Sequence, residues 1–403
     1  MMRSRPLRAL LAAEVISTTG SQMTWLALPW FVLTTTGSAS RMSFVVAAEV
    51  GAYVLFGVPA GAVVARLGAR RTMLLTDGLR APTMLLVPLL HWAGALTYPA
   101  LLLFAFLIGA LGTPYGAAQR VVVPELLGED ETVVTKANAL FQSATRLTLL
   151  AGPPIAGILI GIIGAPGVLV IDAASFAVAF ALVAVAVPPI ATPRGDAGGH
   201  GSVLAGVRYV RRDPLLRLWA VSITIGDGAW QVVFVGTPVL VYTHYGGRAA
   251  LAGLILGGFG GGAIVGNVLA YRLFSAVVPP RLIAAALLVQ ALPLFLLSLP
   301  VPAAALVAAL ALSGAGNGLA NPTIHATLTL RPPPPIRAQV VSAVFTASMI
   351  GGPLALLAAG PAFTALDSRT VLAMAATAQL VAMMMLAASM LTRWDARAPA
   401  YDA

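Results

Sequence analysis

Apolar residues occur along this chain in runs of about 20, the length that lets an α-helix cross the hydrocarbon core of a bilayer. Backbone groups inside lipid must be bonded within their own segment, so such runs form helices. The runs lack the period-two alternation of a membrane β-barrel. We therefore predict an all-α membrane protein with twelve transmembrane helices in two six-helix bundles. The predicted spans are residues 9–34, 42–65, 72–92, 99–120, 138–163, 166–188, 216–241, 249–271, 281–300, 303–327, 339–362 and 369–391.

One long polar segment interrupts this pattern after the sixth span. It contains the turn-forming residues of 192–201 and then a short basic stretch, Val203 to Arg212, with an amphipathic helical pattern. We predict an N-terminal six-helix bundle over 1–188, a cytoplasmic linker with a short amphipathic helix over 189–215, a C-terminal six-helix bundle over 216–392, and a cytoplasmic tail over 393–403.

Charge is scarce and unevenly placed. Only 9% of the residues are charged, against about 25% in soluble proteins. With the N-terminus inside, 19 of the 24 basic residues fall in cytoplasmic segments, as the positive-inside rule requires. The net charge of +10 therefore reports topology, and we expect a lipid bilayer and no nucleic acid as partner. Cysteine is absent, which excludes disulfides and thiolate metal sites.

The two halves resemble each other at an offset of about 200 residues. Gly152-Pro153 in the fifth span corresponds to Gly352-Pro353 in the eleventh, and Gly20 in the first corresponds to Gly226 in the seventh. The matches occur in the same order and in corresponding spans. This is the pattern of parallel six-helix repeats related by an axis along the membrane normal.

The loop after the second span carries a family resemblance. Gly61, Arg66, Gly68 and Arg70 resemble the loop signature G-x-x-x-D-R-x-G-R-[KR] of the major facilitator superfamily, with Ala65 in place of its acid and Ala69 in place of an arginine. In the family that acid helps to latch the two halves on the cytoplasmic side, and this chain has no acid at that position.

The fifth span adds a second signature. Gly152, Pro153 and Gly157 resemble the family's antiporter signature G-P-x-x-G-G, with Ala156 replacing one glycine. The segments 77–81, 124–126, 136–140, 171–176 and 206–214 resemble the bacterial efflux branch, which includes macrolide-efflux-like and enterobactin-exporter-like proteins. The resemblance covers essentially the whole chain. It implies a multi-pass protein of the bacterial inner (cytoplasmic) membrane with both termini cytoplasmic.

Ionisable residues within spans are costly, by about 2.5–3.5 kcal/mol on insertion scales, and so indicate structural or functional roles. Asp77 and Arg80 lie three residues apart on one face of the third span and are expected to pair, as a structural ion pair or as a proton or substrate gate. The candidates for proton coupling are Glu14, Glu49, Asp77 and Asp227.

Polar and aromatic residues of the spans predict a substrate cavity. Glu14 begins a polar stripe on the first span that runs to Trp25, and Asp227 shares a predicted face with Trp230, Gln231 and Phe234. An acid beside aromatic rings suits an amphipathic cation. The cavity candidates are Trp25, Gln142, Arg146, Trp230, Gln231, Asn317 and Asn321.

Other residues are expected to shape or gate the helices. Arg146, near the middle of the fifth span, is expected to pair with an internal acid or to bind an anionic substrate group. Asp172 is expected to be structural. The gating and structural candidates are Gly61, Arg66, Gly68, Arg70, Arg80, Gly152, Pro153, Gly157 and Asp172.

The sequence contains no G-x-x-x-x-G-K-[ST], H-E-x-x-H or G-x-S-x-G motif, so we predict no catalytic residue, no metal, no cofactor and no enzyme activity. The energy then comes from a proton gradient. We predict a monomeric secondary transporter that exports a small hydrophobic or amphipathic molecule by proton antiport with alternating access. A narrow-substrate siderophore or lipid exporter, a nutrient importer and a non-transporting membrane sensor stay open.

Overall fold

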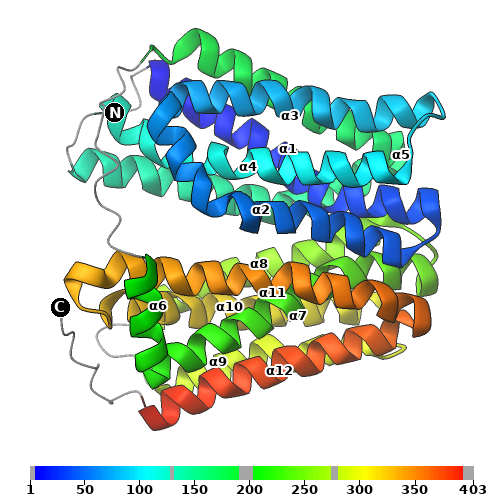
Figure 1. Ribbon diagram of the computed structural model, residues 1–403. Helices are drawn as coiled ribbons and strands as arrows, with labels where there is room; N and C mark the ends of the chain where they lie inside the picture. Colours follow the sequence, from blue (N-terminus) through cyan, green and yellow to red (C-terminus); the bar gives the residue numbers. More distant parts are fainter. Residues whose placement is uncertain (1–4, 128–130, 190–202, 274–279, 394–403) are drawn as a thin grey trace. The chain divides into compact units, whose positions relative to one another are not determined.

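The computed structural model describes residues 5–127, 131–189, 203–273 and 280–393, and within these ranges the elements are helical (Figure 1). Most of the predicted linker and of the predicted tail lie outside the described residues. The helices are α1 (Arg5–Thr36), α2 (Ala39–Leu67), α3 (Ala69–Trp92), α4 (Tyr98–Leu127), α5 (Glu131–Ala186), α6 (Val203–Arg212), α7 (Pro214–His244), α8 (Ala249–Leu273), α9 (Pro280–Ala291), η1 (Leu292–Ser298), α10 (Ala303–Leu330), η2 (Pro334–Ile336), α11 (Arg337–Ala365) and α12 (Ser368–Arg393).

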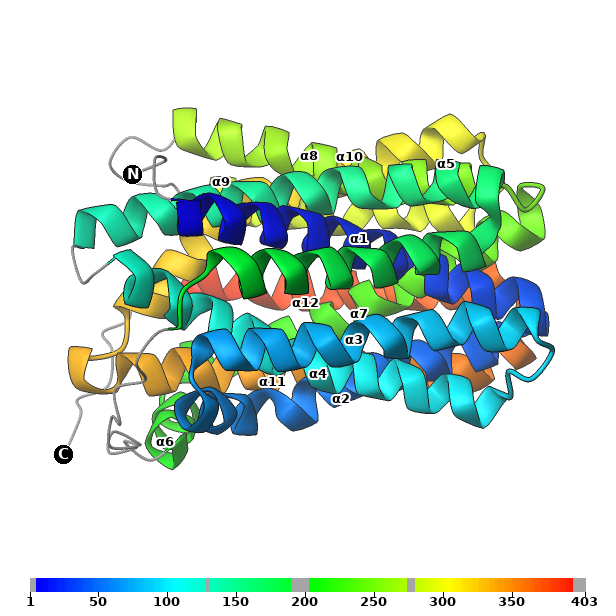
Figure 2. The same ribbon diagram turned by 90° about the horizontal axis from the view of Figure 1, so that it is seen from above.

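The predicted spans are found in these helices. Ten stretches of the described chain are long and apolar enough to cross a membrane, and the stretch in α5 runs through 47 residues. Helix α5 contains a non-helical residue, Gly164, with φ 74° and ψ 163°, a conformation that glycine adopts without strain. The chain reverses its direction at this residue, so the two arms of α5 are antiparallel (Figure 2). With α5 counted twice and the 32-residue α1 added, the described chain has twelve spans.

The ninth span differs from a continuous helix. The sequence predicts a span over 281–300, but α9 ends at Ala291 and continues as the 3₁₀ segment η1. Pro293 explains the change, because its ring displaces the carbonyl of the preceding turn and it has no N–H to donate. The short helix predicted at 203–212 is present as α6, and its basic, amphipathic sequence agrees with a position outside the spans.

The chain divides into two compact units. Unit 1 comprises residues 1–198 and 248–253, and unit 2 comprises residues 199–247 and 254–403. In unit 1, α1 packs on α5, α2 packs on α4, and α3 packs on both α4 and α5. In unit 2, α7 packs on α11 and α12, and α9 packs on α10 and α12. The first span of each half thus packs on the fifth and sixth spans of that half.

Glycines bring paired helices of unit 2 close together. A Cβ atom on Gly262 or Gly266 of α8 would meet a backbone carbonyl of α10, and a Cβ on Gly314 or Gly318 of α10 would meet a carbonyl of α8. The spacing of four residues on both helices repeats the contact at each turn. Small residues at this spacing permit close packing in membranes.

This packing predicts that Gly262→Ala lowers the thermal unfolding midpoint of the detergent-solubilised protein. Alanine improves helix propensity by about 1 kcal/mol, whereas overpacking costs about 1–3 kcal/mol or more when the neighbour is backbone. The matched control is Gly161→Ala, because a Cβ at Gly161 has no atom within 4 Å. We expect this control to keep or raise the midpoint, and an unchanged midpoint for Gly262→Ala would contradict the account.

Candidate functional site

A pocket of about 430 Å³ opens within unit 2, which is the size of many small-molecule sites. Six helices line it, namely α7 to α12. Its lining residues are Ile223, Gly226, Asp227, Trp230, Phe259, Leu287, Gln290, Asn317, Asn321, Ile324, His325, Leu328, Val344, Phe345, Ser348, Met349, Gln379, Met383 and Leu386. Most of these side chains are apolar or aromatic, and Asp227 is the only acid among them.

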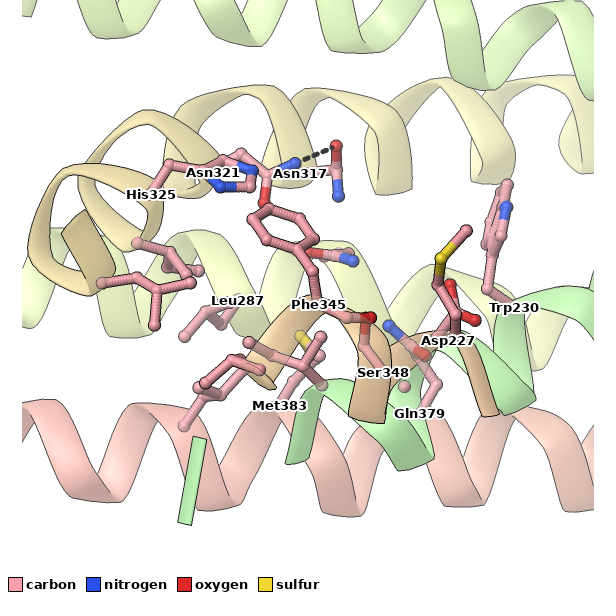
Figure 3. Close-up of a pocket in the computed structure, with 18 of the residues that line it drawn as sticks. Asp227, Trp230, Leu287, Asn317, Asn321, His325, Phe345, Ser348, Gln379 and Met383 are labelled. Carbon is pink, nitrogen blue, oxygen red and sulfur yellow. Dashed lines mark hydrogen bonds between the residues drawn. The ribbon is translucent and has the colours of Figure 1, made fainter. Parts of the chain in front are cut away.

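Asp227 and Trp230 lie at one end of the pocket and His325 at the other, with Phe345 between them (Figure 3). Asp227 is half-buried. The Trp230 ring packs on the ring of Phe259, with 4.1 Å between the centroids. The acid and the aromatic pair therefore share one end of the pocket, which confirms that Asp227 and Trp230 share a face of α7.

Gln231 and Phe234, the two other members of the predicted face, are not among the residues that line this pocket. Gln231 lies against α11 beside Asp227, because a Cβ added to Gly352 would be 3.1 Å from Gln231 Cγ and 3.5 Å from Asp227 Oδ2. Gly352 therefore lets α7 and α11 approach each other at these two side chains.

Amide side chains supply the remaining polarity. Asn321 donates a hydrogen bond to Asn317 at 3.0 Å, so these two predicted residues lie together. The rings of His325 and Phe345 stack with 5.7 Å between centroids. Gln379 of α12 is 2% exposed, and its Oε1 atom accepts no hydrogen bond within the described chain. It was missed from sequence, although it is an isolated amide in an apolar run.

A second polar cluster lies in unit 1. Arg80 Nη1 is 3.8 Å from Asp77 Oδ1, and both side chains are buried, which confirms the predicted pair. The guanidinium also lies over the ring of Phe176, 3.9 Å from its centroid, and over Tyr115 at 5.8 Å. Arg80 Nη2 donates to Ser21 Oγ at 3.3 Å. Neighbouring helices thus hold the arginine from several directions.

Two further acids of unit 1 have different surroundings. Glu14 is 6% exposed and accepts hydrogen bonds from Thr18 at 2.9 Å and from Tyr115 at 3.5 Å. Trp25, at the end of the predicted stripe, is half-buried. Glu49 is half-buried on α2, and a Cβ added to Gly109 of α4 would meet its backbone oxygen.

Asp172 has the structural surroundings that were expected. It is fully buried and accepts hydrogen bonds from Thr24 at 2.6 Å and from Ser175 at 3.1 Å. A Cβ atom on Gly20 of α1 would collide with Asp172 and Ser175. The carboxylate therefore joins α1 to the second arm of α5 where Gly20 permits close contact.

Arg146 lacks the internal acid that was one of its two predicted partners. It is exposed, and it takes part in none of the ion pairs between described residues. Gln142, one turn earlier, is also exposed. The place of these two residues in a substrate cavity stays a prediction.

The signature residues contribute to local geometry. Arg70 donates to the backbone oxygens of Val187 at 2.7 Å and Ala184 at 2.9 Å, so it caps the second arm of α5. Gly68 has φ +80° and joins α2 to α3, whereas Gly61 and Arg66 are exposed. The arrangement gives Arg70 a structural role within unit 1.

The glycines of the Gly-Pro segment face other helices. A Cβ on Gly152 would meet Gln22 of α1. A Cβ on Gly157 would meet the backbone of Ala249, which belongs to the same unit. Pro153, next to Gly152, lies inside α5 and is buried. In the described ranges, no three His, Asp or Glu side chains gather as metal ligands.

An ion pair in unit 2 was missed from sequence. Arg331 Nε donates to Asp213 Oδ2 at 2.7 Å, and the two side chains are 10% and 0% exposed. Asp213 also accepts from the backbone N–H groups of Leu215 and Leu216, so it caps the N-terminus of α7. The signal available was an Asp-Pro pair before an apolar run, which is typical of a helix start.

This pair predicts that Arg331→Met destabilises the protein, because Asp213 then keeps a buried charge without its cation. Removal of one partner from a buried pair costs about 3–5 kcal/mol in free energy of unfolding. Thermal unfolding in detergent measures it. Asp213→Asn combined with Arg331→Met removes both charges and retains a capping side chain, so it should recover part of the loss. Equal midpoints for wild type and Arg331→Met would refute the role of the pair.

Comparison with known proteins places these features in a family. The model of the Major Facilitator Superfamily matches residues 10–356. The chain is 25% identical over 365 residues to the multidrug efflux pump Tap of Mycobacterium bovis (strain BCG / Pasteur 1173P2), covering 88% of this chain and 86% of the relative. It is 26% identical over 368 residues to Tap of Mycolicibacterium fortuitum, covering 88% of each.

Solved structures show the same fold. The nucleoside transporter NupG superposes with a TM-score of 0.78 at 15% identity, over 96% of this chain and 99% of that one. A D-xylose-proton symporter superposes with a TM-score of 0.73 at 14% identity, over 96% and 97%. The predicted two-bundle architecture is that of these transporters.

Proposed function

The chain belongs to the major facilitator superfamily, whose members are transporters and not enzymes, and on that premise we propose that it exports small amphipathic organic cations in exchange for protons. The relatives named as multidrug efflux pumps support export and a broad range of substrates. The location that goes with this function is a bacterial inner membrane, with both termini cytoplasmic.

The pocket of unit 2 supports a cationic substrate. Its one acid, Asp227, lies at the same end as the stacked rings of Trp230 and Phe259. A carboxylate attracts a positive charge, and an aromatic face adds cation–π attraction worth about 0.5–2 kcal/mol. This combination of one acid and an aromatic pair in an apolar pocket is the observation that carries the proposal.

A buried amide narrows the substrate further. Gln379 presents an acceptor oxygen without a hydrogen bond in the described chain, and it lines the same pocket as Asp227. A buried acceptor of this kind is costly unless a ligand or water donates to it. A cationic substrate that also carries an N–H group, as ethidium does in its amino groups, satisfies both Asp227 and Gln379.

Proton exchange supplies the energy in this proposal. The sequence has no nucleotide-binding loop, so the gradient of an ion drives export. Two conformations, open to opposite sides, alternate, and a substrate shifts their balance only by binding them with different affinity. The antiporter-like segment of α5 lies against α1 at Gly152, within unit 1.

Ethidium accumulation in bacteria that lack their own drug pumps tests the proposal. Cells that express the protein should accumulate less dye than cells with empty vector, and a protonophore should remove the difference. Asp227→Asn should reduce efflux by about tenfold, corresponding to about 1.4 kcal/mol of lost cation binding. Asp367→Asn is the matched control, since Asp367 is an exposed acid outside the pocket that bonds His244.

Asp227→Glu keeps the negative charge and should retain more efflux than Asp227→Asn. Equal efflux by wild type and Asp227→Asn, with both proteins present in the membrane at equal levels, would refute the role of the pocket. Accumulation equal to that of empty vector for every variant would refute export of this class of substrate.

A further inference from the structure

Four acids and one arginine occupy the helices of unit 1. The acids come from four elements: Glu14 from α1, Glu49 from α2, Asp77 from α3 and Asp172 from α5. Within the described part of the chain, the positive charge of Arg80 acts on all four of them. Tyr115 of α4 adds a hydroxyl beside Glu14. One guanidinium cannot balance the charge of four carboxylates. Those that it does not balance need hydrogen-bond donors, because a buried charge is costly without them.

Hydrogen-bond donors are distributed unequally among these acids. Asp172 and Glu14 each accept bonds from two hydroxyl groups. Asp77 is fully buried, and neither of its carboxylate oxygens accepts a hydrogen bond in the described chain. Glu49 is half-buried. Asp77 is therefore the fully buried acid of this group whose carboxylate has no hydrogen-bond donor in the described chain.

Arg80 lies too far from Asp77 to form a charge-assisted hydrogen bond with its carboxylate. Its contact with Asp77 is 3.8 Å, longer than the 2.7–2.9 Å of a charge-assisted hydrogen bond. The guanidinium is instead held over Phe176 at 3.9 Å and bonded to Ser21 at 3.3 Å, and its Nε has no partner in the described chain. A buried pair made for stability needs close geometry and satisfied hydrogen bonds. This pair has neither.

The position of Asp77 fits access from one side. It is the ninth residue of α3, which begins at Ala69, so it lies about 12 Å along the helix at 1.5 Å per residue. That end of α3 is the end where Arg70 caps α5, and the sequence predicts it to be cytoplasmic. A proton on Asp77 therefore has a short path to one aqueous face.

We propose that Asp77 carries the exchanged proton and that Arg80 remains charged throughout the cycle. When the carboxylate takes up a proton from water, the Asp77 side chain becomes neutral, and Phe176 and Ser21 continue to hold the Arg80 charge. When the proton leaves to water on the cytoplasmic side, Arg80 balances the carboxylate again. This inference rests on the proposed proton antiport and assigns its proton to unit 1, separate from Asp227 in unit 2.

The separation has a consequence for coupling. Proton and substrate do not compete for one carboxylate, so they affect each other through the equilibrium between conformations, and the coupling is reciprocal. A variant that cannot bind the proton should still exchange one substrate molecule for another, because exchange needs only the substrate-bound conformations to interconvert.

Proteoliposomes that contain the purified protein test this with ethidium as the probe. Two rates are measured for each variant: accumulation driven by a pH gradient, and counterflow, in which labelled ethidium exchanges for unlabelled ethidium without a gradient. Asp77→Asn should reduce driven accumulation by about tenfold or more while counterflow stays within about twofold of wild type. The ratio of the two rates does not depend on the amount of active protein.

Asp172→Asn and Glu49→Gln are the matched controls, because each removes one of the other buried or half-buried acids that Arg80 influences. Both should keep the wild-type ratio even where stability falls. Asp77→Glu retains a carboxyl and should restore driven accumulation, with a shifted pH at half-maximal rate. This variant keeps the test informative if Asp77→Asn does not fold.

Three results would overturn the assignment. In the first, Asp77→Asn keeps the wild-type ratio of driven accumulation to counterflow. In the second, Glu49→Gln lowers this ratio and Asp77→Asn does not. In the third, driven accumulation by Asp77→Glu has the same pH dependence as that of the wild type. In each of them the wild-type protein still accumulates ethidium, so the proposed antiport stands. Failure of the wild type to respond to a pH gradient while counterflow persists would instead refute the antiport itself.

Discussion

The polar interior of unit 1 depends on one constraint, which is that Arg80 is the positive charge shared by its four acids. An ionisable side chain costs about 2.5–3.5 kcal/mol at the centre of a membrane helix, so four uncompensated acids would cost about 10–14 kcal/mol, which is comparable with the whole stability of a domain. Phe176 holds the guanidinium in place, and local hydroxyl groups satisfy Glu14 and Asp172. The acids of unit 1 are thus stabilised by different partners, which are hydroxyl groups for Glu14 and Asp172 and the Arg80 charge for Asp77.

The two halves use one packing scheme for different chemistry. Gly20 lets the first span approach the sixth, and Gly226 lets the seventh approach the twelfth, at Met383. Gly152 and Gly352 do the same for the fifth and eleventh spans. In unit 1 this close packing encloses acids around an arginine, whereas in unit 2 it leaves a pocket with one acid. The repeat therefore conserves contacts between helices while the polar residues diverge.

The sequence predicted what depends on periodicity and local spacing. Span length, the break between the fifth and sixth spans and the Asp77–Arg80 pair all follow from neighbours within a few residues. Contacts between distant helices were not predictable in this way. The exposure of Arg146, the contact of Gln231 with Gly352 of α11 and the ion pair of Asp213 depend on how helices rotate and pack, which is set by residues far away in the chain.

The central claim is that cation and proton move in opposite directions through separate groups. The most direct test is the pH inside proteoliposomes while ethidium enters down its own concentration gradient, with no pH gradient imposed. The account predicts that the interior becomes alkaline as ethidium enters, because protons leave in exchange, and that protein-free vesicles show no such change. Ethidium entry through the protein at constant internal pH would contradict it.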